Sequence, residues 1–546
     1  MTHPNPSTAL ARVVVDELAR AGVGLMVISP GSRSAALAIA AVAHPGLATR
    51  IVIDERSAAF HALGAARATG GPVAVLSTSG TAPANFFPAV VEADMSCLPL
   101  IVVSADRPAE MQGVGANQTI DQIGLFGTKV RGQATIEAPE HDRDLNREWR
   151  TTVSGLLTAA TGSQPGPVHL NVRFREPTVP VTDDGRTEGE VYPHETPPLA
   201  LEHEKSSEPT PDEFPTLAPD RGLIIAGDGE YDRDELAAHA DRLGWPLLAT
   251  ALSGMRGGPV VAGYHHLLAN GVPDDLRPET VVAVGAIGPS PRLESLVDTA
   301  TTRVRVDRWG RVIDPNRNAS ARLRGDVNAL LSMIGSSNHT GWRETWLDAA
   351  KQSDDRVAGI VAESAVPTGP TVAAALDEVD WGALVVASSL PIRDVDAQLR
   401  RPGPVHANRG ASGIDGFVST ALGVAGVIPR TLALAGDLSV LHDSNGFLHD
   451  DDIDLVLVVV DNGGGGLFDL LPQASHAPDY ERLFVTPHHR SFEALARLHD
   501  LRYVDVPDTA ALIEEAGRAL DQSGVDLIRV AVDRAEDLRL RAQLDG

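Results

Sequence analysis

The sequence contains a single cysteine, Cys97, among 546 residues. One cysteine excludes a disulfide within the chain and any metal site built from several cysteines. We therefore expect a protein of the reducing cytoplasm. Long apolar runs are missing too, because no uninterrupted stretch approaches the ~20 residues that a membrane-spanning helix needs. Residues 1–6 are polar and charged residues follow soon after, so we expect neither a secretory signal nor membrane insertion.

Basic residues are outnumbered. The chain has 46 lysines and arginines against 73 aspartates and glutamates, which gives a formal net charge of −27. Such a chain repels the phosphate backbone of DNA and RNA, so we expect no nucleic-acid partner. Anionic small molecules are not excluded, provided that arginines gather in one pocket. The sequence also lacks a GxxxxGK[ST] phosphate loop, an HExxH zinc helix and a GxSxG nucleophile turn.

What the sequence does contain is three blocks in which short apolar strands alternate with helical patterns. This alternation predicts the α/β class with open parallel sheets. We expect three consecutive domains over residues 1–180, 221–345 and 346–546, with a linker rich in proline and acidic residues at 181–220. The strand candidates lie at 25–29, 50–54, 73–77 and 99–104, at 223–227, 281–285 and 302–307, and at 384–388, 431–436, 455–460 and 526–533.

Two strand ends in the third block carry oxygen ligands. One apolar run ends on Gly436-Asp437, and the next ends before Asn462 and four glycines, 463–466. Taken singly, each is an ordinary helix cap or turn. Because the carboxyl ends of parallel strands meet at one edge of a sheet, we expect Asp437 and Asn462 to lie together there. Carboxylate and amide oxygens suit Mg²⁺, and glycines let the backbone approach a diphosphate closely. The sequence therefore predicts a metal–diphosphate site.

The strands of the first block also end in polar turns. If these turns share one sheet edge, they form a crevice in which arginines bind carboxylates. Considered alone, Glu55 is a favourable first-turn carboxylate of a helix, and each arginine is a solvated surface residue. The residues that the turns deliver are Ser32, Arg33, Glu55, Ser79, Gly80 and Arg107.

Longer stretches are similar to one enzyme family. They resemble the 2-succinyl-5-enolpyruvyl-6-hydroxy-3-cyclohexene-1-carboxylate synthases, which are thiamine-diphosphate-dependent enzymes of menaquinone biosynthesis. Glu55 and the Gly436-Asp437 motif are typical of the wider thiamine-diphosphate superfamily, although Leu438 replaces the usual third-place glycine. The central segment departs from the family at Pro291, where we expect a basic residue. The stretches that carry the resemblance are SPGSRSAAL at 29–37, IDERSAAFHALGAA at 53–66, TSGTAPANFFPAVVEA at 78–93, SADRP at 104–108, GANQTIDQ at 115–122, NRGASGIDG at 408–416 and the AGDLS and DNGGGGLF segments.

The resemblance implies a pyrimidine-binding first domain, a central domain and a diphosphate- and metal-binding third domain. It also implies a homodimer or homotetramer in which thiamine diphosphate lies between the first domain of one subunit and the third domain of another. Asp437, Asn462 and the carbonyl of Gly464 are the implied ligands of Mg²⁺ or Mn²⁺. The implied cofactor-binding residues are Glu55, Ser79, Gly80, Ile414, Gly436, Leu438, Ser439, Gly464, Leu467, Phe468 and Leu471.

The reaction that the resemblance implies is decarboxylation of 2-oxoglutarate, followed by 1,4-addition of the resulting carbanion to isochorismate. Glu55 matches the family glutamate that hydrogen-bonds the aminopyrimidine ring. Two alternatives stay open, which are another thiamine-diphosphate lyase, such as an acetohydroxyacid synthase or a 2-oxo acid decarboxylase, and a non-catalytic metabolite-binding protein. We expect no catalytic histidine. The implied catalytic residues are Glu55, Ser32, Gln118 and Ser389, and the implied substrate-binding residues are Arg33, Arg107, Asn117, Arg292, Arg393 and Arg409.

Overall fold

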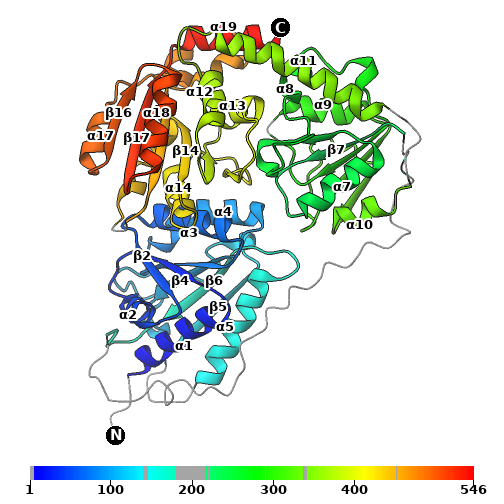
Figure 1. The fold of residues 1–546 in the computed structure, drawn as a ribbon. Helices are drawn as coiled ribbons and strands as arrows, with labels where there is room; N and C mark the ends of the chain where they lie inside the picture. The colour runs from blue at the N-terminus through cyan, green and yellow to red at the C-terminus, as the bar shows by residue number, and fades with distance from the viewer. Residues whose placement is uncertain are drawn as a thin grey trace. The chain divides into compact units, whose positions relative to one another are not determined.

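The computed structural model describes residues 5–138, 145–179, 217, 220–288, 290–335, 341–449, 452–476 and 478–546. The predicted linker at 181–220 lies almost wholly outside the described residues. The described chain contains three parallel sheets with helices between their strands (Figure 1). This confirms the predicted α/β class with three open parallel sheets.

The first and third sheets share one topology. Numbered by their order within each sheet, the strands of both lie in the order 2-1-3-4-6-5. In both, the second strand lies on one side of the first strand and the third strand lies on the other side, so the order of the strands reverses there. In open parallel sheets, such a reversal opens a crevice at the carboxyl ends of the strands. The first sheet consists of β2 (Ala48–Ile51), β1 (Leu25–Ile28), β3 (Val73–Ser77), β4 (Leu100–Asp106), β6 (Val168–Arg173) and β5 (Gly132–Glu137). The third consists of β13 (Val405–His406), β12 (Ala383–Val386), β14 (Thr431–Gly436), β15 (Leu455–Asp461), β17 (Val525–Ala531) and β16 (Arg502–Val506).

The second sheet is smaller. Its strand order is β11 (Ala321–Arg324), β10 (Thr302–Asp307), β9 (Thr280–Val284), β7 (Gly222–Ala226) and β8 (Leu247–Ala249). Every residue of β7, β8 and β9 is buried, as expected for parallel strands covered by helices on both faces. Helices α7 (Arg233–Leu243), α8 (Tyr264–Leu267), α9 (Pro291–Thr299), α10 (Val327–Ser332) and α11 (Trp342–Ala362) belong to this part of the chain.

Helices cover both faces of the first sheet. One apolar core joins it to α1 (Pro6–Arg20), α2 (Ala35–Ala43) and α5 (Asn146–Thr161). A second core joins the opposite face to α3 (Glu55–Thr69) and α4 (Phe87–Ser96) (Figure 1). Both faces of β3 and β4 are therefore dry, and the polar side chains at their ends, Ser77 and Asp106, are buried as well.

The described residues fall into two compact units. One consists of described residues from Met1–Glu204, Asn408–Ile428 and His442–Ile453, and the other of those from Lys205–Ala407, Pro429–Leu441 and Asp454–Gly546. Two segments of the predicted third domain thus belong to the unit of the first sheet. The domain boundaries themselves stay a prediction.

Close helix packing explains how 408–428 joins the first unit. Its helix α14 (Phe417–Ala425) packs on α3 along much of its length. A Cβ at Gly64 of α3 would lie 2.2 Å from the Thr420 carbonyl oxygen, and one at Gly423 would lie 2.1 Å from the His61 carbonyl oxygen. Only glycine allows two helix backbones to approach this closely.

The third sheet is accompanied by α12 (Gly369–Ala375), α13 (Leu390–Gln398), α15 (Asp437–His442), α17 (Phe492–Leu498), α18 (Thr509–Leu520) and α19 (Arg534–Asp545). One apolar core unites α12, α13 and α18 with the sheet. Among the described residues, no helix combines the length and the apolar character needed to cross a bilayer.

Candidate functional site

The turns after β3 and β4 meet in a tight polar cluster. Arg107, which follows β4, donates from Nη1 to the Ser79 hydroxyl in the turn after β3. The Ser79 hydroxyl in turn donates to the Gln118 carbonyl at 3.0 Å, and Gln118 Nε2 donates to the Ser79 carbonyl at 2.9 Å. Gly80 adopts φ +87°, and a Cβ there would lie 2.8 Å from Gln118 Cγ. The structure therefore brings four predicted site residues into mutual contact.

Two arginines lie side by side at this cluster. Burial, and then the positive charge of Arg33, lower the pKa of the Arg107 guanidinium. Arg33 itself pairs with the Glu176 carboxylate at 3.0 Å, and its backbone N–H donates to Thr78 Oγ1 at 3.3 Å. Guanidiniums in partly buried surroundings are suited to binding carboxylates, and Glu176 already engages Arg33 in this way.

A buried glutamine that was not predicted as a site residue hydrogen-bonds the backbone of this cluster. Gln122 is 1% exposed, and its Oε1 accepts the N–H of Gly80 at 3.1 Å. Its Nε2 faces three acceptors, Ser104 Oγ at 3.2 Å, the Ala105 carbonyl at 3.2 Å and Asn171 Oδ1 at 2.8 Å. Gln122 lies in the quoted GANQTIDQ stretch, but only the fold shows that its side chain turns inward.

We expect Gln122→Ala to loosen the Ser79–Gly80 turn. The substitution leaves the buried Gly80 N–H without its acceptor, which costs about 1–3 kcal/mol if it stays unsatisfied, and it removes one donor from three buried acceptors. Thermal unfolding should show a clear loss of stability, and turnover should fall. Gln352→Ala, at an exposed position of α11, is the matched control, and it should change neither quantity. Equal behaviour of the two variants would contradict the role of Gln122.

Glu55 is the first residue of α3 and is half-buried. Asp54 caps the helix by accepting the Ser57 N–H at 3.1 Å, and its other oxygen accepts from Asn445 at 3.0 Å. No described residue hydrogen-bonds or pairs with the Glu55 carboxylate. The carboxylate is therefore available to a bound molecule, while the helix start beneath it is fixed.

The other predicted residues of this unit lie in loops. Ser32 and Asn117 are exposed. The loop that carries Arg409 and Ile414 is held by Glu92 of α4, whose carboxylate accepts the N–H groups of Gly410 at 2.8 Å and Ala411 at 2.6 Å. Within the described part of the chain, no hydrogen bond or ion pair joins Ser32, Asn117 or Ile414 to Arg107 or Ser79.

A second cluster lies at the ends of β14 and β15. These strands pair in register, with Gly436 opposite Val460. The N–H of Gly464 lies 2.8 Å from Asp437 Oδ2 and 3.3 Å from Asn462 Oδ1, so the predicted metal ligands converge on one point. The Gly464 carbonyl accepts the Gly466 N–H at 3.0 Å and keeps a second lone pair.

Asp437 is 2% exposed, and its charge is poorly compensated. Burial, together with the nearby Asp461 carboxylate, raises the pKa of Asp437 to about 6. His488 Nε2 lies 3.2 Å from Asp437 Oδ2, and Arg529 binds Asp461 at 2.6 Å. Neither Asp461 nor His488 was predicted to belong to this site, although Asp461 directly precedes the predicted Asn462.

Other predicted residues surround this cluster. A Cβ at Gly436 would meet nothing within 4 Å, so its backbone faces open space. Ser439 is buried, and the Leu438 N–H donates to Asp437 Oδ1 at 2.6 Å. Leu467, Phe468 and Leu471 are half-buried at the short helix Gly466–Leu470 that follows the glycines.

Ser389 and Arg393 stand at the start of α13, after β12. Arg393 Nη1 donates to the Ser389 carbonyl at 2.5 Å, and burial lowers the pKa of this guanidinium. Arg292 lies elsewhere in the same unit, on α9, where it pairs with Asp545 at 2.6 Å and donates to the His265 carbonyl at 2.6 Å.

Comparison with known proteins identifies the family. Residues 8–125 match the family model "Thiamine pyrophosphate enzyme, N-terminal TPP binding domain", and residues 192–373 match "Middle domain of thiamine pyrophosphate". A 2-succinyl-5-enolpyruvyl-6-hydroxy-3-cyclohexene-1-carboxylate synthase from Thermobifida fusca is 42% identical over 99% of this chain and 98% of its own length. The chain belongs to this synthase family. Synthases of the same name from Rubrobacter xylanophilus and Halobacterium salinarum are 39% and 38% identical, over 99% and 100% of this chain and 98% of their own lengths.

The residues at the ends of β14 and β15 fit the metal-bound diphosphate that this synthase family implies. Two buried carboxylates, Asp437 and Asp461, lie close enough for one to raise the pKa of the other, and a divalent cation would neutralise both. Gly463 and Gly464 have φ of +76° and +150°, which favour glycine, and their N–H groups donate to Asp461 Oδ1 at 3.1 Å and Asp437 Oδ2 at 2.8 Å. Oxygen donors and a glycine-rich turn therefore meet the needs of a metal-bound diphosphate.

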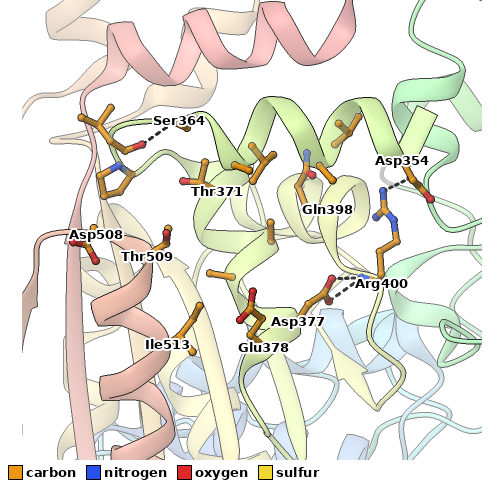
Figure 2. Close-up of a pocket in the computed structure, with 18 of the residues that line it drawn as sticks. Asp354, Ser364, Thr371, Asp377, Glu378, Gln398, Arg400, Asp508, Thr509 and Ile513 are labelled. Atoms are coloured by element: carbon orange, nitrogen blue, oxygen red, sulfur yellow. Dashed lines mark hydrogen bonds and ion pairs between the residues drawn. The ribbon is translucent and has the colours of Figure 1, made fainter. Parts of the chain in front are cut away.

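A separate cavity lies away from these residues. Its volume is about 530 Å³. Residues of α11, α12 and α18 line it, and Figure 2 shows several of them. Burial raises the pKa of Asp377 at its wall, and Arg400 pairs with Asp354 at 2.9 Å. None of the predicted substrate, cofactor or metal residues lines it. The cavity is therefore not part of the predicted site.

Proposed function

We propose that this chain decarboxylates 2-oxoglutarate and joins the remaining four-carbon unit to isochorismate, giving the product named by its family. Its similarity to the synthases over nearly the whole length supports this reaction. The observation that carries the proposal is the buried Arg107 guanidinium, which bonds the Ser79 hydroxyl beside Gln118 and lies near enough to Arg33 for the two charges to interact. Both substrates are dicarboxylates, and an acidic chain needs such fixed cations to bind them.

The cofactor-binding residues divide by chemistry. When bound, thiamine diphosphate supplies the electron sink that lets a 2-oxo acid lose CO₂ and deliver its acyl carbon as a nucleophile. Glu55 would hold the aminopyrimidine ring by a hydrogen bond, and its carboxylate would support proton transfer there. Asp437, Asn462 and the Gly464 carbonyl would hold Mg²⁺ or Mn²⁺, and Leu467, Phe468 and Leu471 would exclude water. Ser79, Gly80, Ile414, Gly436, Leu438 and Ser439 complete the contacts.

The substrate-binding residues orient carboxylates and hydroxyls. Arg33, Arg107, Arg393 and Arg409 bind the carboxylates, and Arg292 does so if its pair with Asp545 opens. Ser32, Asn117, Gln118 and Ser389 orient the polar groups of the substrates.

The assembly follows from the same proposal. The chain forms a homodimer or homotetramer, with the cofactor between the first domain of one subunit and the third domain of another. We also propose that the chain is cytoplasmic, which agrees with its single cysteine.

The proposal is tested by measuring CO₂ release from purified protein with thiamine diphosphate, Mg²⁺ and 2-oxoglutarate, with and without isochorismate. We expect strong release only when both substrates are present, together with loss of the isochorismate absorbance. Turnover of pyruvate alone would instead place the protein with the decarboxylases or acetohydroxyacid synthases.

We expect Arg107→Ala to raise the KM of at least one dicarboxylate substrate about 10- to 100-fold, because a charge-assisted hydrogen bond is worth about 1.5–3 kcal/mol. Thiamine diphosphate affinity should change little. Arg131→Ala, which removes a pair with Asp94 in the same unit, is the control. An unchanged KM for both substrates would count against the arginine pair.

A further inference from the structure

Helix α13 begins on a strained residue. Ser389, its N-terminal cap, has φ +78° and ψ −130°, a conformation that is nearly confined to glycine. A serine persists there only where the surrounding structure fixes it. Because Arg393 donates a hydrogen bond to the Ser389 carbonyl, the position of its guanidinium depends on the strained backbone of Ser389. Whatever holds α13 therefore also sets the position of both side chains.

One buried arginine holds the side of α13. Arg541 of α19 binds both oxygens of Asp394 in a fork, with Nη2 at 2.8 Å from Oδ2. Arg541 Nε also donates to Asp537 at 2.6 Å, and Asp537 accepts the N–H of Gly369, the first residue of α12, at 2.7 Å. Asp394 is 4% exposed, so this pair is dry. The fork ties α13 to α12 and to the C-terminal helix.

A second buried arginine holds the C-terminal end of α13. Arg256 is 3% exposed and donates to the Val395 carbonyl at 2.9 Å, the Asp396 carbonyl at 2.6 Å and the Leu399 carbonyl. These are carbonyls of the last helical turn, whose partial negative charge favours a cation. The Asp396 side chain adds bonds from Tyr264 Oη at 2.5 Å and the Ala251 N–H at 2.9 Å.

We propose that Arg541 and Arg256 are positioning residues for the substrate-binding end of α13. The two arginines bind this nine-residue helix at its side and at its C-terminal end. The helix therefore cannot rotate or shift in a way that would relax the backbone of Ser389. The strain at Ser389 is thereby maintained, and Arg393 stays where a carboxylate meets it. This inference rests on the proposed function of Ser389 and Arg393, and it adds two residues that touch no substrate.

The test uses the full-length protein and the variants Arg541→Lys and Arg256→Lys, which keep the charge but lose the planar fork. Hydrogen exchange of peptides that cover 388–399 should quicken in both, and the KM of at least one dicarboxylate should rise at least tenfold. Arg150→Lys is the control, because Arg150 forms a buried pair with Asp16 and Glu17 in the other unit. It should lower the melting temperature without either effect.

A double-mutant cycle separates positioning from general stability. Glycine adopts the backbone angles of Ser389 without strain, so Arg541→Lys should quicken exchange of α13 less in a Ser389→Gly background. Unchanged KM values for both substrates in both arginine variants would overturn the inference, even if stability falls. If the wild type forms no product, the proposed function fails separately, and the exchange cycle still decides whether the two arginines hold α13.

Discussion

Glu55→Gln is expected to lower turnover by a factor of about 10² to 10⁴ while leaving thiamine diphosphate affinity nearly unchanged. Glutamine has almost the same shape as glutamate, so the contact with the aminopyrimidine ring persists, but an amide cannot support the proton movement that a carboxylate supports. The carboxylate stands at the start of α3, and no described residue competes for it. The measurement is steady-state turnover with both substrates, beside a thiamine diphosphate titration followed by protein fluorescence.

The control for Glu55 is another first-turn glutamate. Glu148 lies in the first turn of α5 in the same unit and is exposed. Glu148→Gln loses the same favourable interaction with the helix dipole, worth about 0.3–1 kcal/mol, without touching the proposed chemistry. If Glu55→Gln kept near-normal turnover, or if Glu148→Gln matched its loss, the proposed role of Glu55 would be removed.

The parallel sheets explain why the sequence could predict which candidate site residues lie close together. A strand that is buried on both faces is a continuous apolar run, and its carboxyl end is the point where that run stops. Asp437 and Asn462 stand at two such ends, and β14 and β15 are neighbours, so their convergence follows from the fold class. The contact between Arg107 and Ser79 follows in the same way from neighbouring β3 and β4.

The unpredicted residues are those whose role depends on side-chain direction or on distant packing. Gln122 sits in a loop with no periodicity, and only tertiary structure turns its amide toward Gly80. His488 reaches Asp437 from a segment far along the sequence. Arg541 lies on an ordinary charged helix, and nothing local shows that it meets a buried carboxylate on α13.

The packing of 408–428 is a further case. The segment follows a strand of the third sheet, and so the alternation of strands and helices places it in the third domain. Its contact with α3 depends instead on Gly64 and Gly423, which lie far apart in the sequence and become partners only when two helices cross. Local pattern cannot predict such a pairing, because it shows which residues are small but not which helices meet.

Removing the charge of Asp437, a proposed metal ligand, is the second change with a large expected effect. Asp437→Asn should weaken metal-dependent thiamine diphosphate binding at least about 100-fold, since it takes away the buried charge that a divalent cation neutralises. The pH dependence of the wild type should be distinctive. Burial raises the pKa of Asp437 to about 6, so near pH 5 the folded state holds a proton that the unfolded state has released. The contribution of this group to the stability of the metal-free protein therefore falls as the pH rises through 6.

Metal binding should show the opposite trend. The cation binds the carboxylate and displaces the proton, so metal affinity should fall about tenfold for each pH unit below 6. We would measure the melting temperatures of wild type and Asp437→Asn from pH 5 to 8, without ligand and with Mg²⁺ and thiamine diphosphate. The difference between the two proteins isolates this carboxyl group from all others. Asp479→Asn, at an exposed site of the same unit, should follow the wild type. The charge at Asp437 would not hold the metal if the rise in the wild-type melting temperature on adding Mg²⁺ and thiamine diphosphate did not change with pH. The same conclusion would follow if Asp437→Asn still bound the cofactor with Mg²⁺.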